Sequence, residues 1–452
     1  MSRTQSWVAA LLGAALAAGV ALAAPMPTAQ ARVLAITLFA IVAWIAAPVP
    51  PWVTGLAAIG LIGVAQTPAL ALSGFGSPAT WLIVFGLVVG EATRRSGLAT
   101  ATQTFVFRHL DVAGADPRGL YYRLLALLCA VALAFALLLP AALVRVLIAI
   151  PVLVAIGTVF EDRRPRLGVF FAPLFATYYG ASGILTANLP NVIITGIVES
   201  VAGVSITWSE WFVSLFPVMS LARVLLIFAV VGVLYRPSPD AALSPPSAAD
   251  GETGDARRML CLLFVGVAFW ASDAVHGLHP MFGALLVAVL ALLPRVGVMD
   301  YGAVEDVDFS VVFFVGAVFA ISAALAETGF TETAANALLR FIPADAPSAV
   351  VLGCVFFVTL ALTFVIEGVA VSSVLTPILV TFAASAGIPV DHVAYVEASA
   401  LATFFFPYQS AVLVVILRAD LVETRDVIRT ASLLSIATVL VLLPAEIGYL
   451  TL

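Results

Sequence analysis

Apolar stretches follow one another along almost the whole chain, and polar residues gather in short segments between them. Because about 20 apolar residues cross a bilayer as one helix, each long stretch predicts a membrane helix, and the chain has room for roughly ten to twelve of them. We expect helices near residues 6–24, 33–49, 52–66, 78–95, 209–235, 258–272, 281–294, 309–327 and 430–450.

Two further stretches, residues 120–160 and 347–386, predict helical hairpins. Each has two apolar limbs and one charge near its middle, Arg145 in the first and Glu367 in the second. Arginines flank the first hairpin on both sides, so it leaves and re-enters on one side of the membrane. It can do so as a re-entrant loop or as two full spans, and hydropathy leaves both open. An ionisable side chain costs roughly 2.5 kcal/mol or more at the bilayer centre, so both charges are candidate site residues.

The stretch 167–202 is too long for one straight helix and carries Pro190 between Asn188 and Asn191. Proline removes a backbone donor and clashes with the preceding turn, so a break is expected there. Freed backbone groups at membrane depth are tolerated only where protein or a watery cavity satisfies them. The stretch 392–418, with Pro407, repeats the same pattern.

Residues 236–257 are rich in Pro, Ser, Ala, Asp and Gly and predict a cytoplasmic linker between two halves, 1–235 and 258–452. The halves share an order of elements and some spacings. Ser96 stands twelve positions before Arg108, and Thr328 stands twelve before Arg340. Because each half crosses the membrane an odd number of times, the second half has the opposite orientation in the membrane. Inverted repeats with paired broken helices are typical of secondary transporters, whose site lies at the midplane between the repeats.

Composition agrees with this class: 63% of the residues are hydrophobic, 10% are charged and the mean hydropathy is +1.15. The chain is therefore predicted to be an all-α, multi-pass protein of the cytoplasmic membrane, with no cofactor and no nucleic-acid partner. Cytoplasmic loops collect arginine, which predicts a cytoplasmic N-terminus and an outer C-terminus. The arginines that decide this orientation are Arg94, Arg95, Arg108, Arg118, Arg123, Arg163, Arg164, Arg166, Arg236, Arg257, Arg258, Arg418, Arg425 and Arg429.

Candidate substrate residues cluster at the first predicted break. Thr186, Asn188 and Asn191 lie inside an otherwise apolar span, where an unsatisfied amide costs several kcal/mol. They either bind an ion or substrate, or act as a clamp, that is, they form hydrogen bonds with the backbone groups freed at the helix break.

The planar guanidinium of Arg145 presents paired N–H donors whose geometry matches a carboxylate, sulfate or phosphate. The alternative is an ion pair between Arg145 and Glu367, which would also suit a gate. Further lining candidates are Ser372, Gln409 and Ser410. Weaker candidates are Glu91 and Glu397, placed close to the interface, and Arg223, which we expect to snorkel.

Taken together, the chain resembles the divalent anion:sodium symporter family of the ion transporter superfamily over nearly its whole length. The resembling stretches include Trp44 with Pro48-Val49-Pro50, Gly74-Phe75-Gly76, Trp81-Leu82, Ser96-Gly97-Leu98 and Thr186 to Asn191. The resemblance implies eleven spans plus two re-entrant hairpins, a homodimer and elevator-type movement. It also implies a small anionic substrate such as a dicarboxylate, citrate or sulfate.

The sequence departs from that family at both hairpin tips. Where the family has Ser-Asn-Thr for sodium and substrate, this chain has Ala141-Ala142-Leu143 and Glu367-Gly368-Val369. Sodium coupling, proton coupling through Glu367, and exchange therefore all stay open. Two other functions also remain: a cation or proton antiporter of the same superfamily, and an intramembrane serine protease built on Gly180-Ala181-Ser182-Gly183.

Overall fold

The computed structural model describes residues 7–8, 13–15, 17–19, 26–108, 114–244, 255–341, 346–417 and 419–452. Within these ranges the chain is helical, with no β-strand beyond one isolated bridge between Phe160 and Leu243. The all-α prediction is thereby confirmed for the described part. The helix expected near 6–24 falls largely outside it.

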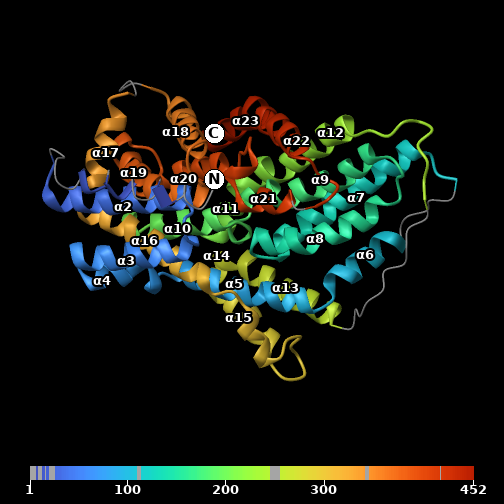
Figure 1. Ribbon diagram of the computed structural model, residues 1–452, viewed down its shortest axis with the longest axis horizontal. Helices are drawn as coiled ribbons and strands as arrows, with labels where there is room; N and C mark the ends of the chain where they lie inside the picture. Colours follow the sequence, from blue (N-terminus) through green and yellow to red (C-terminus); the bar gives the residue numbers. More distant parts are fainter. Residues whose placement is uncertain are drawn as a thin grey trace.

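The first half contains two outer helices, a hairpin and a broken span (Figure 1). Its elements are α2 (Thr28–Ala46), α3 (Pro51–Ala65), α4 (Pro68–Leu72), η1 (Ser73–Gly76), α5 (Pro78–Arg95), α6 (Leu98–Arg108), α7 (Pro117–Leu138), α8 (Ala142–Gly157), α9 (Arg163–Tyr178), η2 (Gly180–Gly183), η3 (Leu185–Ala187), α10 (Leu189–Ala202), α11 (Trp208–Leu215), the π-helical η4 (Phe216–Ala222) and α12 (Arg223–Leu234).

The second half repeats that order. Its elements are α13 (Ala256–Ala271), α14 (Asp273–His276), α15 (Met281–Leu292), η5 (Tyr301–Asp306), α16 (Ser310–Glu327), α17 (Phe330–Leu339), α18 (Ser348–Thr363), α19 (Gly368–Ala386), α20 (Val390–Leu401), η6 (Pro407–Gln409), α21 (Ala411–Ile416), α22 (Thr424–Ala437), the π-helical η7 (Thr438–Leu442) and α23 (Leu443–Leu450).

Six continuous helical stretches in the described residues are long and apolar enough to cross a membrane. They are Thr28–Ala46, Pro117–Leu138, Trp208–Leu234, Ser310–Glu327, Gly368–Ala386 and Thr424–Leu450. A seventh candidate is Pro68–Gly76 with Pro78–Arg95, which bend by 48° at their junction. Several shorter apolar helices, among them α3, α8 and α18, accompany them. The chain is thus a multi-pass membrane protein.

Local sequence explains both hairpin turns. After α7, Pro140 cannot continue the helix, and Ala141 adopts a left-handed conformation with φ 73° before α8 begins. In the second hairpin the carboxylate of Glu367 accepts a hydrogen bond of 3.0 Å from the Val369 amide and so caps α19. Pro151 and Pro377 lie inside α8 and α19, as the sequence predicts for the second limbs.

Packing between the halves is reciprocal. In the first broken span, α9 packs on its own hairpin, and α10 packs on α19 of the other hairpin. In the second, α20 packs on α18 and α19, and α21 packs on α8. The outer helices exchange partners in the same way, since α3 packs on α16 and α15 packs on α5. This pattern supports the proposal of two related halves, 1–235 and 258–452.

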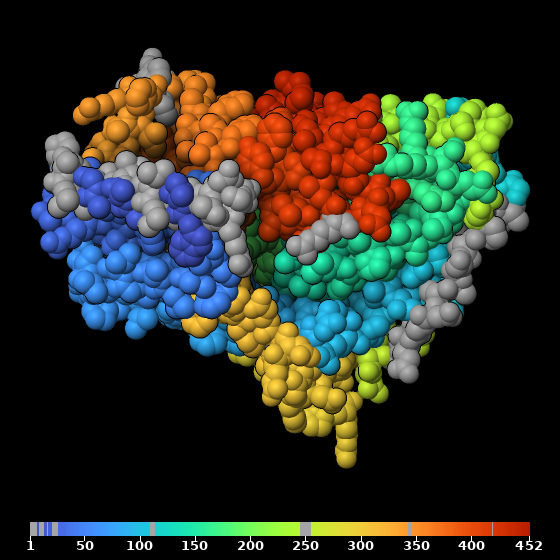
Figure 2. All heavy atoms as spheres, in the orientation of Figure 1, coloured from blue at the N-terminus to red at the C-terminus, as the bar shows by residue number. Residues whose placement is uncertain are grey.

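The two hairpins occupy opposite ends of the molecule, with α10, α20 and α21 between them (Figure 1). The space-filling view shows α15 and the loop after it projecting from one face, drawn in yellow (Figure 2). The broken spans are therefore the elements that connect the two ends.

Candidate functional site

Four segments that interrupt the α-helices meet where the two halves join. They are the first hairpin turn (tip 1, residues 139–141), the segment between α9 and α10 (break 1, residues 179–188), the second hairpin turn (tip 2, residues 364–367) and the segment between α20 and α21 (break 2, residues 402–410). Together we name them the polar centre. Its segments are joined by hydrogen bonds from a small number of buried side chains.

Arg145 joins tip 1 to break 1. Its side chain is buried, and its Nη1 donates to the carbonyls of Leu139 at 2.6 Å and Ala187 at 3.0 Å. Its Nε and Nη2 donate to Thr177 at the end of α9, at 3.1 and 2.9 Å. Of the five guanidinium protons, one on Nη2 has no assigned acceptor. Arg145 therefore anchors the backbone of the polar centre, and one N–H group on its Nη2 is left to donate to another partner.

Gln409 makes the corresponding connection in the second half. Its Oε1 accepts from the amides of Phe405 and Phe406 at 2.7 and 2.8 Å, while its Nε2 donates to Thr363 at the end of α18. Nearby, the Tyr408 hydroxyl donates to the Phe364 carbonyl at 2.9 Å. Tip 2 is thus tied to break 2 as tip 1 is tied to break 1.

Arg223 joins the two breaks. Its guanidinium is buried and donates to the Ser182 hydroxyl of break 1 at 3.3 Å and to the Thr403 hydroxyl of break 2 at 3.0 Å. A second link runs from the Tyr178 hydroxyl to Ser410 Oγ at 2.5 Å. The prediction that Arg223 snorkels to the interface is wrong, because its side chain reaches inward to polar groups of both halves.

The predicted residues of break 1 have different surroundings. Asn191 is buried, and its amide nitrogen donates to the carbonyls of Ser182 and Ile184, both at 3.1 Å. Thr186 Oγ1 accepts from Trp208 Nε1 at 3.3 Å. Asn188 instead has a buried Oδ1 with no hydrogen-bond partner in the described protein, although it precedes the first turn of α10. Asn188 therefore carries the unused polar atom of this segment.

The charges of the two hairpins do not pair. In the described part of the chain no ion pair joins Arg145 to Glu367, and Glu367 instead caps α19. Ser372, on the first turns of α19, is buried and donates to the Val369 carbonyl at 2.8 Å. The alternative of a direct Arg145–Glu367 pair is therefore wrong for this conformation.

Helix N-termini give the polar centre a positive character. Both α8 and α10 begin there, without a side-chain cap and without an acidic residue in the first turn. An uncapped helix N-terminus carries about half a unit of positive charge and unpaired amide donors. Since one nitrogen of Arg145 bonds both Leu139 and Ala187, the two helix starts lie close together. This arrangement suits a small anion.

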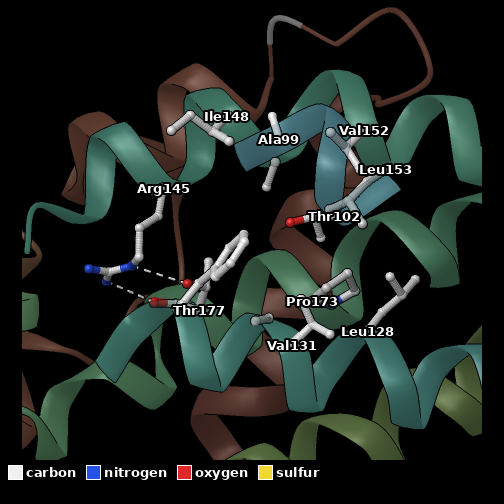
Figure 3. Close-up of a pocket in the computed structure, with 13 residues that line it drawn as sticks. Ala99, Thr102, Leu128, Val131, Arg145, Ile148, Val152, Leu153, Pro173 and Thr177 are labelled. Atoms are coloured by element: carbon white, nitrogen blue, oxygen red, sulfur yellow. Dashed lines mark hydrogen bonds between the residues drawn. The ribbon is translucent and has the colours of Figure 1, made fainter. Parts of the chain in front are cut away.

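A neighbouring pocket has a different character (Figure 3). It lies between α6, α7, α8 and α9, and its lining is apolar apart from Thr102, Arg145 and Thr177. The guanidinium of Arg145 turns toward Thr177 and away from Ala99 and Val152 (Figure 3). This pocket offers too few polar partners for a hydrophilic anion, so we place the candidate site at the polar centre.

Sequence reasoning underestimated two buried charges. Glu397, placed close to the interface by the sequence, is fully buried on α20 and accepts from Thr376 Oγ1 at 2.8 Å. Glu446 on α23 is also fully buried, and neither of its oxygens has a hydrogen-bond partner in the described residues. Each glutamate lies within a mostly apolar stretch of the sequence, which was the available signal. Glu91 does lie near the end of α5, paired with Arg94 and Arg95.

Among the residues that the structure describes, no histidine base bonds to Ser182. Its Oγ lies 2.8 Å from the Met219 carbonyl oxygen and also contacts Arg223. The described histidines, His276, His279 and His392, have contacts elsewhere, and His109 lies outside the described residues. The serine protease reading is therefore not supported.

Comparison with known proteins gives a consistent family. A profile described as the sodium:sulfate symporter transmembrane region matches residues 4–450. A membrane protein of Cupriavidus necator is 27% identical over 329 residues, which cover 66% of this chain and 62% of that protein, less than two thirds of its length. The L-tartrate/succinate antiporter of Escherichia coli K12 is 23% identical over 381 residues, which cover 79% of this chain and 74% of that protein.

Among solved structures, the YdaH transporter of Alcanivorax borkumensis has a similar fold. The TM-score is 0.59 at 16% sequence identity, and the match covers 94% of this chain and 99% of that chain. At this identity the likeness concerns the fold alone. It supports the predicted all-α membrane fold.

Proposed function

This chain belongs to the sodium:sulfate symporter family. We propose that it is a secondary transporter of small anions in a cell membrane and that the anion binds at the polar centre. The cation or proton antiporter considered from the sequence has no support from the family. The relative that exchanges L-tartrate and succinate favours a dicarboxylate as the cargo.

The observation that carries the proposal is the meeting of two uncapped helix N-termini, those of α8 and α10, beside Arg145 and Asn188. Backbone amides at the two helix starts donate to the anion, and the two partial positive charges stabilise it. Arg145 adds a formal positive charge with its remaining Nη2 donor. Asn188 provides the N–H donors of its side-chain amide at the N-terminus of α10.

The other predicted residues shape this site. Asn191 holds the backbone of break 1, and Gln409 holds that of break 2. Thr186 ties break 1 to Trp208 on α11, and Ser410 ties break 2 to Tyr178 on α9. Ser372 lies on the first turns of α19, beside the second tip. Glu367 occupies the N-terminus of α19 with its own carboxylate, so that terminus is closed to an anion until Glu367 moves. We therefore assign Glu367 a gating role.

Assembly and movement follow from the family resemblance. We propose a homodimer with the N-terminus in the cytoplasm and the C-terminus outside, and an elevator-type movement of the hairpins and broken spans. Sodium, protons or a counter-anion can each drive such a cycle.

Ligand-dependent thermal stabilisation tests the cargo. Binding to the folded state raises apparent stability by mass action. Purified protein is heated with succinate, L-tartrate, citrate, sulfate or chloride, with and without sodium, and exchange of the stabilising anion is then measured in proteoliposomes. We expect stabilisation and exchange with a dicarboxylate and none with chloride. Stabilisation by cations alone, with no exchange of any anion, would contradict the proposed function.

A further inference from the structure

Glu397 has an environment that an ionised carboxylate does not tolerate. It is fully buried on α20, its Oε1 accepts one hydrogen bond from Thr376, and its Oε2 has no partner in the described protein. No ion pair reaches it from any described cation. Burial of an unpaired charge costs several kcal/mol. The carboxyl group therefore holds a proton in this conformation.

The helices around Glu397 offer no compensating charge. Its own helix and the helices packed against it carry few titratable groups, and none of those described bonds to Glu397: Asp391, His392 and Tyr395 on α20, Cys354 on α18, Glu199 on α10 and Glu210 on α11. Along α19 there is none, and Glu367 precedes its first residue. Glu199 lies 3.8 Å from His279, and Glu210 caps α11.

The half-buried Glu367 and the buried Glu446 are less suited to carry a proton. Glu367 sits at a helix N-terminus and accepts the Val369 amide, which stabilises its ionised form. Glu446 lies within electrostatic reach of the Arg223 guanidinium. Glu397 alone among these three has neither a helix terminus nor a cation to stabilise its charge.

Its position connects Glu397 to the moving parts of the proposed site. The hydrogen bond from Thr376 joins α19, the second limb of the hairpin, to α20, the first part of the broken span. One turn beyond Glu397, Leu401 lies against Gly368 at the start of α19, directly after tip 2. A movement of tip 2 relative to break 2 therefore changes the surroundings of Glu397.

We propose that Glu397 is a proton-binding site of the transport cycle, so that a proton accompanies the anion. This inference rests on the proposed function. When α19 and α20 separate enough to admit water, the carboxyl O–H bond breaks, its electron pair stays on the carboxylate, and the proton passes to water on that side. On the other side of the membrane a proton from water restores the carboxyl group.

Reconstituted protein tests this assignment. Proteoliposomes containing a trapped pH-sensitive dye receive succinate, L-tartrate or sulfate outside, and anion uptake and internal pH are followed together. A second set, loaded with the same anion inside, reports anion exchange. The wild-type protein is expected to carry protons with the anion. The Glu397→Gln variant keeps a neutral side chain of the same size, so we expect it to retain anion exchange while proton movement falls to that of empty liposomes. The Glu199→Gln variant, which removes a carboxylate on α10, is the matched control and keeps proton movement.

Two results would overturn the inference, and a third concerns the function itself. Anion transport by the wild-type protein without any proton movement rejects a proton site, whatever the variants do. Unchanged proton movement in Glu397→Gln rejects Glu397 as that site. If Glu397→Gln fails to fold, Glu397→Asp keeps a carboxyl group and must keep proton movement. Absence of transport of all three anions by the wild-type protein contradicts the proposed function instead.

Discussion

The sequence leaves two roles open for Asn191: a clamp that bonds the backbone of break 1, or a ligand of the substrate. Replacing Asn191 distinguishes between them. The structure shows its amide nitrogen donating to two carbonyls of break 1, those of Ser182 and Ile184. Neither carbonyl becomes orphaned in Asn191→Ala, since Ser182 also accepts from Trp211 Nε1 and Ile184 also accepts from the Ala187 amide. The loss is therefore two hydrogen bonds at about 1 kcal/mol each, or about 2 kcal/mol of unfolding free energy.

The Asn191→Asp variant is expected to be worse. It removes the same two donors and also aims a buried, unpaired carboxylate at two carbonyl oxygens, which costs several kcal/mol more. A matched control is Asn336→Asp, because Asn336 is exposed on α17.

Chemical denaturation of the purified protein without substrate gives the free energies directly. We expect the unfolding equilibrium constant of Asn191→Ala to rise about 30-fold, the equivalent of about 2 kcal/mol. If Asn191→Ala unfolds within about 0.5 kcal/mol of the wild-type protein but loses its stabilisation by substrate, the clamp interpretation is wrong and Asn191 is a ligand.

Substitutions at two other positions give independent tests. Arg145→Ala leaves the Leu139, Thr177 and Ala187 carbonyls without these donors, so both the unfolding free energy and anion uptake should fall. Arg145→Lys keeps the positive charge, but a lysine cannot bond all three carbonyls. Full stability of Arg145→Ala would refute the anchoring role. Burial lowers the pKa of His279 from its usual 6.5 to about 4, so the folded protein binds this proton less readily than the unfolded chain. Its contribution to stability is thus lost as the pH falls from about 6.5 to about 4, and melting curves of His279→Gln should show a smaller loss over that range.

Much of the fold could be predicted from the sequence because each feature has a local cause. Long apolar stretches, the prolines at positions 140, 151, 190 and 377, and the polar linker predict helices, turns and boundaries without knowledge of packing. The π-helical segments η4 and η7 could not be predicted in this way. Pro217 lies in η4 and Pro444 follows η7, but a proline in an apolar helix does not by itself distinguish a local change of helical period from a bend.

The candidate site was harder to predict than the fold. Residue type predicted that Asn188, Asn191 and Arg145 lie at membrane depth, but not which carbonyls Asn191 and Arg145 bind. Those partners belong to segments up to 42 residues away, as for Arg145 and Ala187. Burial of Glu397 and the inward direction of Arg223 depend on the packing of α19, α20 and the two breaks against each other. Such information is absent from a single apolar stretch.

Equilibrium binding of radiolabelled succinate to Asn188→Asp tests the proposed anion site most directly. Asn188 makes no side-chain cap hydrogen bond in the structure, but an aspartate at this position lies beside two helix N-termini whose partial positive charges stabilise a carboxylate, so the variant should fold. Its negative charge at the start of α10, beside the start of α8, should nevertheless repel a dicarboxylate. We expect the wild-type protein and Asn336→Asp to bind succinate and Asn188→Asp to bind none. Binding by Asn188→Asp with unchanged affinity would contradict an anion site at these helix N-termini.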